Sequence, residues 1–581
     1  MDDPIGCRER ILSEPVGILG AGVAGLINAY VLLQDGFTNI TVITRDRSVG
    51  GTWSRDRVYP GLRINNVHGE YRFSALKMAP PEDAAETGGH ITGMGMCEYM
   101  ETFYSNFLEN KATFKFETEI RRLFRNQDGL WIVNVEDMRT GKSESLNFNR
   151  VILCTGGCSN PKFPDELSPD TAGKYQFPGI VIHSSQFRSR LNDILSKVGS
   201  RNLNETGTKE GTILVVGGGK SAMDICAKLA NEGRRVVNIF ESPDRFLASK
   251  SAIPDFIRKS RFLSILSPHI VLRSRLERFL HTTTIGSYIT HFIWNKLAET
   301  SLDAYSIPKD SPFRSPFSLF WGIRSNDEGR VRAGSYYSLV NTGQIEVISP
   351  ARALGFTDDG KSVRLSNGTN VLAQVIILAT GWQSSWTGLF DEQTSTELGI
   401  GRHAPLSVLK GVDHIWNYKT LANPPAAHPD NIAQNWVTSV YRGIVPGKNI
   451  LRRDFAIAGA MFSSNVGYMT EVCAHWTSSY FQGDPMRLPS SPEEAIKEGE
   501  LSAAWMRRRY PNMLSWINES YSTTLDFWTW PQAADELLED MHVRSLRSGG
   551  NWLTWPFHII DLSELSTLGD ERRAVRENRK L

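Results

Sequence analysis

The sequence predicts an α/β protein with two Rossmann-like dinucleotide-binding domains, a mostly helical insertion and a C-terminal extension. Two observations predict this class. Short apolar runs end in glycine-rich loops at 20–25 and 217–222, and each loop is followed by a helical pattern and a second apolar run. A strand, a glycine loop, a helix and a further strand form the βαβ unit of nucleotide-binding folds. Two such units indicate two nucleotide-binding domains in one chain.

The length of the chain supports this division. Its 581 residues exceed what one hydrophobic core supports, so we expect two or three packed units. The expected boundaries are a first domain at 1–175, a second domain at 176–345 with the helical insertion at about 246–325, a return to the first domain at 346–480, and a Trp-rich extension at 481–581.

Composition excludes several classes. The net charge of +1 gives no basic field that would attract nucleic acid. Six scattered cysteines fit a reducing compartment better than a disulfide framework. The first residues lack a signal-peptide core, and no apolar run is long enough to span a bilayer. We therefore expect a cytoplasmic protein that binds no nucleic acid and no metal, and the oligomeric state stays open.

The first loop carries Gly20, Gly22 and Gly25 in G-x-G-x-x-G spacing. These glycines allow a tight turn and a close backbone approach to a pyrophosphate, and the helix that follows offers free N–H groups. An acidic residue for the ribose hydroxyls should follow about 20 residues later. The second strand ends instead in Thr44, so Asp46 is the candidate substitute.

The second loop carries Gly217 and Gly219, followed by Lys220 and Ser221, in the G-x-G-x-x-A variant. Glu241, near the end of the next strand, favours ribose hydroxyls over a 2′-phosphate. Nearby cations would reverse that preference if they reach the phosphate. They are Lys220, Arg234, Arg235 and Arg245.

Three further segments complete the pattern. "SVGGTW" contributes Gly50, Gly51, Thr52 and Trp53, and two apolar strands end in Thr-Gly, at Thr155-Gly156 and at Thr380-Gly381. With the two loops, these segments resemble the class B flavin-dependent monooxygenases, the flavin-containing and Baeyer–Villiger group, over about residues 15–480. The resemblance implies that the first loop binds FAD, that the second binds NADPH, and that the Gly-Gly-Thr-Trp and Thr-Gly segments frame the flavin. NADH is not excluded, because of Glu241.

The stretch "FPGIVIHSSQF" lies between the two loops. Its Phe177, Gly179, His183 and Phe187 match the family's F-x-G-x-x-x-H-x-x-x-[FYW] signature, where the FAD domain continues into the nicotinamide domain. The resemblance implies that the glycine allows close packing and that His183 orders this linker as the domains shift. We include His183 among the catalytic candidates.

A cysteine pair suggests a different reaction. Cys154 and Cys158 flank "TGG" and could act in disulfide reduction. A redox thiol needs surroundings that lower its pKa, and this pair occupies a Thr-Gly turn without a helix start. We favour structural cysteines.

The resemblance also implies the chemistry. NADPH reduces FAD, dioxygen adds to flavin C4a, and the (hydro)peroxide passes one oxygen atom to a small lipophilic substrate. The protonated form attacks amine or sulfur, and the deprotonated form attacks a ketone. Asn65 in "LRINN" matches the Asn of flavin-containing monooxygenases, and Phe187 replaces the Trp of the Baeyer–Villiger signature, so both favour the first branch.

Two alternatives remain. Arg330 or Arg332 lies near the place of the Baeyer–Villiger family's peroxide-stabilising arginine, so oxidation of a ketone to an ester or lactone is the first alternative. The second is a flavin-binding scaffold without turnover, because the acid expected at Thr44 is missing.

The insertion and the extension carry less specific signals. Residues 246–325 contain eleven Lys and Arg against five Asp and Glu, a net charge of +6, with apolar residues at helical spacing. We favour a cap on the substrate side whose apolar face is core, over basic helices that lie on an anionic membrane. The Trp-rich tail resembles extended fungal-type members and suggests secondary metabolite biosynthesis.

Overall fold

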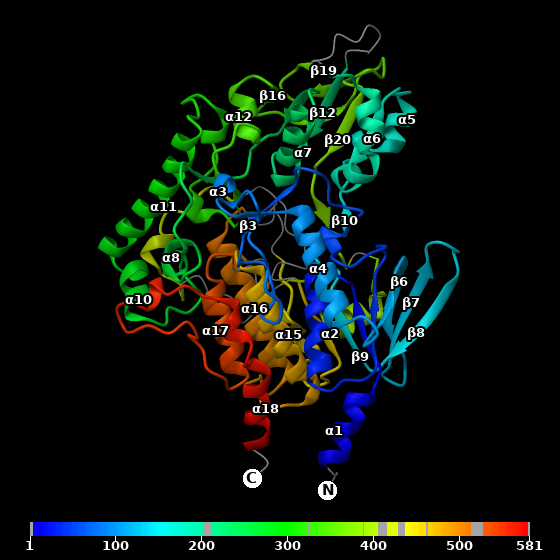
Figure 1. Cartoon of the computed structure of the whole chain (residues 1–581), viewed down its shortest axis with the longest axis vertical. Coiled ribbons are helices and arrows are strands. Elements are labelled where there is room, and N and C mark those ends of the chain that lie inside the picture. The colour runs from blue at the N-terminus through cyan, green and yellow to red at the C-terminus, as the bar shows by residue number, and fades with distance from the viewer. Residues whose placement is uncertain are drawn as a thin grey trace.

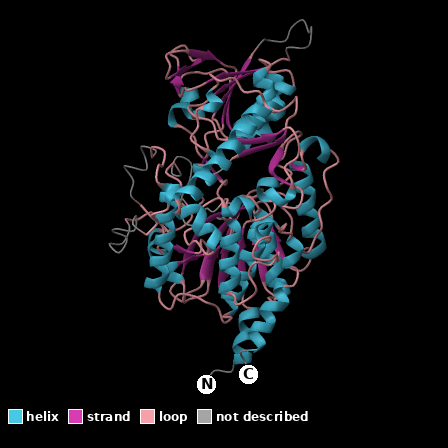
Figure 2. Ribbon diagram, turned by 90° about the vertical axis from the view of Figure 1, so that its left-hand side faces the viewer, coloured by secondary structure: helices cyan, strands magenta, loops and turns pink. Residues whose placement is uncertain are grey.

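A computed structural model gives two lobes, each with its own sheet and covering helices (Figure 2). It describes residues 4–200, 211–323, 325–386, 388–404, 415–427, 436–459, 463–512 and 527–578. Both large sheets are entirely parallel, as expected for βαβ units whose strands are buried on both faces. The two-domain α/β fold predicted from the glycine loops is confirmed.

The first lobe is built on a sheet with strand order β24-β9-β1-β2-β5. Its strands are β1 (Val16–Leu19), β2 (Ile40–Ile43), β5 (Thr113–Lys115), β9 (Arg150–Leu153) and β24 (Phe455–Ile457). The helix α2 (Val23–Gln34) follows β1 and packs against α15 (Val466–Gln482). The late strand and helix thus complete a lobe that the chain begins near its start.

Two smaller groups of strands belong to this lobe. The antiparallel strands β6 (Thr118–Arg125), β7 (Trp131–Asp137) and β8 (Ser143–Phe148) form a sheet on one side (Figure 1). The strand β3 (Arg63–Val67) pairs with β4 (His90–Thr92), which leads into α4 (Gly93–Phe107). Because β3 carries Asn65, this pair matters for the site.

The second lobe has the strand order β11-β20-β12-β13-β16. Its strands are β11 (Ile180–His183), β12 (Thr212–Val216), β13 (Arg235–Ile239), β16 (Ile345–Ile348) and β20 (Val375–Leu378), and its helices are α6 (Phe187–Lys197), α7 (Lys220–Asn231) and α12 (Tyr336–Asn341). A three-stranded sheet of β17 (Ala353–Phe356), β18 (Ser362–Leu365) and β19 (Asn370–Leu372) precedes β20.

One domain boundary differs from the expectation. The chain was expected to return to the first domain at 346, yet β20 lies between β11 and β12 in the second sheet. An apolar run such as "VIIL" has the same pattern in either parallel sheet, so the sequence alone does not assign it. The return follows β21 (Trp382–Gln383), which pairs with β10 (Asn160–Pro161) where the two connections between the lobes meet.

The insertion is bounded by β14 (Phe246–Ser249) and β15 (Asn326–Arg330), which pair in parallel. Between them lie α8 (Asp255–Arg258), α9 (Phe262–Ile265), α10 (Arg275–Thr282) and α11 (Thr284–Ala304), with α10 and α11 at the edge of the molecule (Figure 1). One face of α11 is buried in an aromatic core through Trp294, whereas Ile285 and Tyr288 are exposed. The expected core-facing cap is therefore present, together with an apolar outer face.

The extension packs on the first lobe and on the insertion through α16 (Pro492–Arg509), α17 (Trp530–Asp540) and α18 (Leu568–Asn578). Two buried arginines fix α18. Arg572 donates to the carboxylate of Asp35 at 2.8 Å, just beyond α2, and Arg576 donates to Asp484 at 2.5 and 2.7 Å. Within the described ranges, none of the helices combines the length and apolar character needed to cross a bilayer.

Candidate active site

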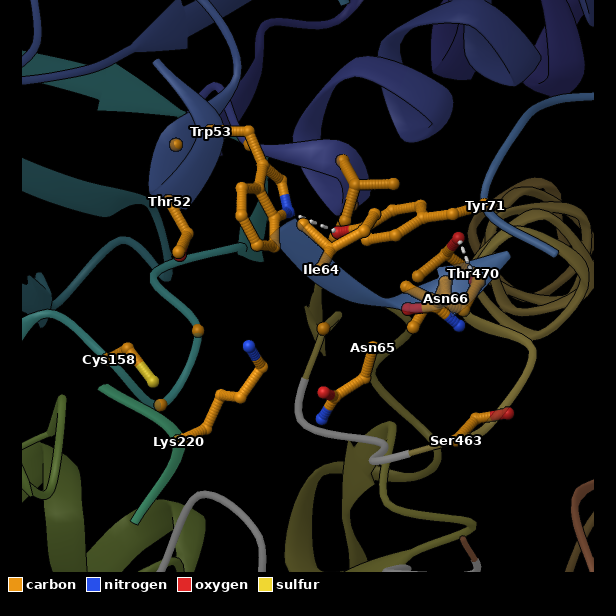
Figure 3. Close-up of a pocket in the computed structure, with 18 of the residues that line it drawn as sticks. Thr52, Trp53, Ile64, Asn65, Asn66, Tyr71, Cys158, Lys220, Ser463 and Thr470 are labelled. Atoms are coloured by element: carbon orange, nitrogen blue, oxygen red, sulfur yellow. Dashed lines mark hydrogen bonds between the residues drawn. The ribbon is translucent and has the colours of Figure 1, made fainter. Parts of the chain in front are cut away.

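A large cavity of about 720 Å³ lies where the two lobes, the insertion and the extension meet. Figure 3 shows part of its wall, with Trp53 and Tyr71 on one side and Lys220 and Asn65 facing the open space. The predicted residues that line it are Gly20, Gly22, Asp46, Gly50, Gly51, Thr52, Trp53, Asn65, Lys220 and Ser221.

The first glycine loop has the shape of a backbone cradle. Gly20 has a φ of +125°, and a Cβ there would lie 2.4 Å from the Cys154 carbonyl oxygen, while a Cβ on Gly25 would lie 1.9 Å from the carbonyl oxygen of Gly20. At Gly22 a Cβ would meet only the Cα of Gly51, at 3.6 Å. Because the N-cap residue is Gly22, no N-cap side chain bonds to the N–H groups in the first turn of α2. A ligand phosphate can therefore approach these N–H groups, as FAD requires.

The Gly-Gly-Thr-Trp segment closes on this loop. The N–H of Gly50 donates to the carbonyl of Ala21 at 2.9 Å, and a Cβ on Gly51 would lie 2.8 Å from the Cα of Gly22. The indole N–H of Trp53 donates to the Tyr71 hydroxyl at 3.1 Å. The segment thus forms a second wall of the cavity beside the cradle (Figure 3).

Asp46 lies at the cavity where a ribose-binding acid is expected. Its Oδ1 accepts from the guanidinium of Arg57 at 2.8 and 3.2 Å. The neighbouring Arg45 donates to the carbonyl of Ser159 at 2.7 Å and also lines the cavity. The strand end therefore presents an ion pair, where the usual motif has a lone acid after the second strand.

The second glycine loop repeats the geometry of the first. Gly217 has a φ of +134°, and Gly219 is the N-cap of α7 without a side-chain bond. Lys220 points into the cavity (Figure 3) and is ion-paired with Asp224. Burial raises the pKa of Asp224 to about 6, although Lys220 opposes this shift. Gly217 and Gly219 themselves do not line the cavity, so this loop borders the site through Lys220 and Ser221.

The residues expected to select the coenzyme have partners of their own. Glu241 is more than half exposed and its carboxylate lies 2.5 Å from the guanidinium of Arg352. Arg245 donates to the carbonyl oxygen of Phe317 at 2.8 Å. Sequence reasoning missed Arg352, which comes from the segment after β16.

His183 does not line the cavity, and its catalytic assignment gives way to a linker role. It is fully buried, its Nε2 lies 3.0 Å from the Gly381 carbonyl oxygen, and its Nδ1 accepts from the N–H of Ser185 at 3.1 Å. Burial lowers the pKa of His183 to about 4, so the ring is neutral near neutral pH. Thr380 and Gly381 share this junction and also lie outside the cavity.

The rest of the linker signature packs tightly. A Cβ on Gly179 would lie 2.4 Å from the carbonyl oxygen of Gln374, which explains the glycine. Phe187 is fully buried, and its ring meets Tyr59 edge-on at 4.8 Å. Because Tyr59 lines the cavity, the linker contacts the site through one aromatic ring.

Asn65 is held by the chain that leads into β15. Its Nδ2 donates to the Ser325 carbonyl at 3.2 Å, and its Oδ1 accepts from the backbone N–H of Asp327 at 3.2 Å. The neighbouring Asn66 also lines the cavity and donates to the Ser464 carbonyl at 2.8 Å. The amide of Asn65 is therefore fixed in place by the end of the insertion.

Beside Asn65 lies a buried charge cluster that sequence reasoning missed. Arg258 of α8 donates to both carboxylate oxygens of Glu70, at 2.7 and 3.0 Å, and to Asp327 at 2.5 Å. Burial opposes the charge of Arg258, yet Asp327 and Glu70 raise its pKa above the ordinary value. Burial likewise opposes ionisation of Asp327, and Arg258 outweighs it and lowers the pKa.

The two arginines proposed from sequence lie elsewhere. Arg330 donates to the carbonyl of Ala85 at 2.7 Å, and Arg332 is paired with Glu328. Neither lines the cavity. The sequence did not predict the contact between Arg258 and Asn65, because the two residues are far apart in the chain and no motif spacing connects them.

The far end of the cavity is aromatic. Trp294 of α11 and Trp528 of the extension meet at 4.8 Å, and Leu263, Leu297 and Phe527 line the same end. The indole N–H of Trp294 donates to the Leu266 carbonyl at 2.8 Å, and that of Trp528 donates to Gly322 at 3.1 Å. Their polar atoms are thus bonded to backbone, so these rings offer hydrocarbon surface to a ligand. The Trp-rich composition of the tail was the only sequence signal for this wall.

The cysteine pair offers no redox site of the thiol type. Cys154 and Cys158 both line the cavity and form no disulfide with each other. Burial raises the pKa of the Cys154 thiol well above its usual range, which disfavours the thiolate. Among the described residues, no three His, Cys, Asp or Glu side chains gather as metal ligands would.

Known proteins are similar to this chain in sequence and in fold. Residues 14–261 match the family described as pyridine nucleotide-disulphide oxidoreductase. An FAD-dependent monooxygenase of Alternaria brassicicola is 26% identical over 597 residues, covering 97% of this chain and 95% of the relative. A Baeyer-Villiger monooxygenase of Streptomyces coelicolor is 34% identical over 176 residues, which is 30% of each chain.

Among solved structures, cyclohexanone monooxygenase in its open form superposes with a TM-score of 0.54 at 17% identity, covering 91% of this chain and 97% of that one. At this identity the likeness shows the fold alone. The near full-length sequence relatives, the two nucleotide loops and the shared fold agree with one another. Together they support the recognition of this chain as similar to the class B flavin-dependent monooxygenases, which are oxidoreductases that use FAD.

Proposed function

We propose that this protein is an FAD- and NADPH-dependent monooxygenase that inserts one oxygen atom of O2 into a small lipophilic metabolite at an electron-rich heteroatom or carbon. The observation that carries the proposal is Asn65, whose amide lies on the common cavity and is fixed by two hydrogen bonds to the backbone of 325–327. When bound, FAD accepts hydride from NADPH and then activates dioxygen. The chain supplies binding, orientation and exclusion of water.

The first loop would hold the FAD pyrophosphate. The N–H groups at the start of α2 and the bare Cα of Gly22 offer the close approach that a phosphate needs. Trp53, Thr52 and Gly51 form the wall beside it. The second loop and Lys220 would hold the nicotinamide coenzyme from the other lobe.

An amide at position 65 supports transfer to a soft nucleophile over oxidation of a ketone. It is uncharged and can both donate and accept, whereas a carboxylate would add a negative charge beside the reacting oxygen. The nearby Arg258 is paired with two carboxylates, Glu70 and Asp327, so this guanidinium adds no excess positive charge at Asn65.

The aromatic end of the cavity supports a lipophilic substrate. Trp294 and Trp528 present ring surface whose N–H groups are already bonded, and Leu263 and Leu297 line the space beside them. Transfer of apolar ligand surface from water to such a wall lowers the free energy of the complex. On the resemblance to extended fungal-type members, we place the reaction in secondary metabolite biosynthesis.

We propose NADPH as the preferred coenzyme. Arg352 lies beside Glu241 at the end of β13 and is more than half exposed, so it can turn toward a 2′-phosphate. Rapid-mixing reduction of the flavin by each coenzyme tests this preference. A faster reaction with NADH would reverse it.

The function itself is tested on purified protein. The proposal expects a yellow protein whose visible absorbance bleaches with NADPH and which converts methyl phenyl sulfide to its sulfoxide. Asn65→Asp should keep FAD and release more hydrogen peroxide per NADPH, because the carboxylate loses the donor to Ser325. An enzyme that converts cyclohexanone to its lactone and leaves the sulfide untouched would instead be a Baeyer–Villiger monooxygenase. Protein that NADPH does not bleach would be a scaffold.

We also propose peripheral contact with an anionic membrane through the outer face of the insertion. Ile285, Tyr288 and Phe292 are 57% to 72% exposed, at i, i+3 and i+7 spacing on α11. The flanking charges Arg275 and Lys296 are positive, and residues 278–298 contain no Asp or Glu. An exposed apolar stripe with basic flanks is the pattern of helices that lie in a lipid interface.

A further inference from the structure

Arg258 joins three parts of the molecule that are distant in sequence. It lies at the end of α8 in the insertion, whereas Glu70 follows β3 of the first lobe and Asp327 belongs to β15. A fourth bond runs from its Nη2 to the backbone carbonyl of Asn65 at 3.0 Å. One guanidinium thus fixes both the main chain of Asn65 and the strand that holds the Asn65 amide.

The junction is closed on all sides. The side chains of Arg258, Glu70 and Asp327 are 13%, 5% and 9% exposed. Glu70 also accepts from the N–H of Val67 at 3.0 Å, and Asp327 accepts from the N–H of Gly329 at 2.9 Å. The Nε2 of His90 lies 3.3 Å from Oδ1 of Asp327, the oxygen that also accepts from Gly329. Each carboxylate is therefore held by backbone as well as by Arg258, which leaves little freedom for the group between them.

We propose that Arg258 is a positioning residue of the monooxygenase reaction, which sets Asn65 against the flavin from the substrate side of the cavity. Its charge is spent on Glu70 and Asp327, so it acts through Asn65 and not as a free cation at the reacting oxygen. A planar guanidinium bonds these acceptors at once, and an ammonium presents no such fork. Ile257, the residue before it, lines the cavity, so the same turn contacts the space for substrate.

This inference rests on the proposed function, because a misplaced Asn65 should separate NADPH consumption from oxygenation. The test compares Arg258→Lys with Arg261→Lys. Arg261 lies in the same insertion and is also buried, with 6% of its side chain exposed. It forms a pair with Asp535 at 2.7 and 2.9 Å and does not line the cavity. It therefore controls for the general cost of changing a buried arginine.

With methyl phenyl sulfide, Arg258→Lys should lower sulfoxide formed per NADPH by about tenfold, the size usual for partners that orient a functional group. Hydrogen peroxide should rise to match, and flavin reduction by NADPH should stay within about twofold. Arg261→Lys should keep the wild-type ratio of sulfoxide to NADPH. Equal uncoupling in the two variants would overturn the inference.

A double-variant cycle decides whether Arg258 acts through Asn65. If it does, Arg258→Lys combined with Asn65→Ala should uncouple no more than Asn65→Ala alone, because the first change has nothing left to position. Losses that multiply would overturn the inference.

A spectroscopic readout needs neither NADPH nor oxygen. The visible circular dichroism of bound oxidised FAD should change alike in Arg258→Lys and Asn65→Ala, and should keep its wild-type form in Arg261→Lys. An unchanged spectrum in Arg258→Lys would count against the inference. A wild-type protein that bleaches with NADPH yet oxygenates nothing would defeat the proposed function, while the spectra would still judge Arg258.

Discussion

The two ends of the cavity are built in different ways. The end that we propose for the cofactor, called the cofactor end, is backbone from short contiguous motifs, with Gly20, Gly22 and Gly51 brought together so that no side chain intervenes. The end that we propose for the substrate, called the substrate end, is made of side chains from far apart in the chain, such as Arg258 and Trp528. The cofactor end depends on glycines that have no side chain, and the substrate end depends on specific contacts between side chains. Substitutions at the two ends should therefore have different effects on ligand binding and on stability.

The largest effect is expected at the substrate end. Arg258→Met leaves Glu70 and Asp327 buried without their cation, which should lower the free energy of unfolding by about 3–5 kcal/mol. Chemical denaturation of the holoprotein measures this loss. Arg261→Met breaks a buried ion pair outside the cavity and is the matched control. It should also lower the free energy of unfolding, without disturbing the contacts of Asn65.

The pH dependence of this loss has a definite sign. In the wild type, Arg258 holds the pKa of Asp327 below its ordinary value, so that stabilisation is present above the unfolded pKa and is lost only in strong acid. In Arg258→Met, burial without this cation should raise the pKa of Asp327, so the folded variant takes up a proton as the pH falls. The deficit should therefore be larger at pH 8 than at pH 5. A deficit independent of pH would show that the carboxylates are not its cause.

The next effect tests the cofactor end. Gly22→Val should keep the fold, because a Cβ there meets only the Cα of Gly51 at 3.6 Å, yet it fills the space that a pyrophosphate needs. Flavin affinity should fall at least about a hundredfold, equivalent to about 2.8 kcal/mol. The ratio of visible to ultraviolet absorbance after purification measures occupancy, with Gly173→Val in α5 as control. Full occupancy in Gly22→Val would remove FAD from this loop.

The second loop should fail in a narrower way. Gly219→Val should leave the flavin bound and slow its reduction by NADPH about tenfold or more, equivalent to about 1.4 kcal/mol, because the change lies at the N-terminus of α7. Rapid-mixing absorbance measures the rate. Loss of flavin from this variant would mean that the two loops do not have separate ligands.

The smallest effect concerns the outside of the insertion. Phe292→Glu places a negative charge on the exposed stripe and should reduce co-sedimentation with phosphatidylserine vesicles a few-fold, by about 1 kcal/mol. Leu372→Glu on β19, at 55% exposure, is the control for a lost exposed hydrophobe elsewhere. Wild-type protein that self-associates through this face and ignores vesicles would contradict membrane contact.

The contrast between the ends also explains what could be predicted from sequence. The glycine loops and Gly179 meet local requirements of the backbone, so their spacing was enough to predict the fold, a cofactor cradle and a packed linker. Arg258, Trp294 and Trp528 form contacts with residues that are distant in sequence, and no local sequence pattern predicts such contacts. His183 matched its signature yet serves the linker, because a motif records that a residue is needed and not what it touches. The strand at 375–378 was assigned to the wrong domain for a similar reason, because an apolar run does not indicate which of two parallel sheets the strand joins.

The arginines of α18 have a consequence for biosynthesis. The helix that starts at the first glycine loop ends beside Asp35, which is bonded to Arg572, and the same lobe takes β24 from residues 455–457. A nascent chain therefore exposes its first nucleotide motif early but lacks the partners that complete that lobe until residues 455–457 and 572 have left the ribosome. Domains usually fold in the order of synthesis. Here the first lobe begun is the last finished, so we expect stable flavin capture to follow translation, and a nascent chain halted at residue 450 to stay without FAD.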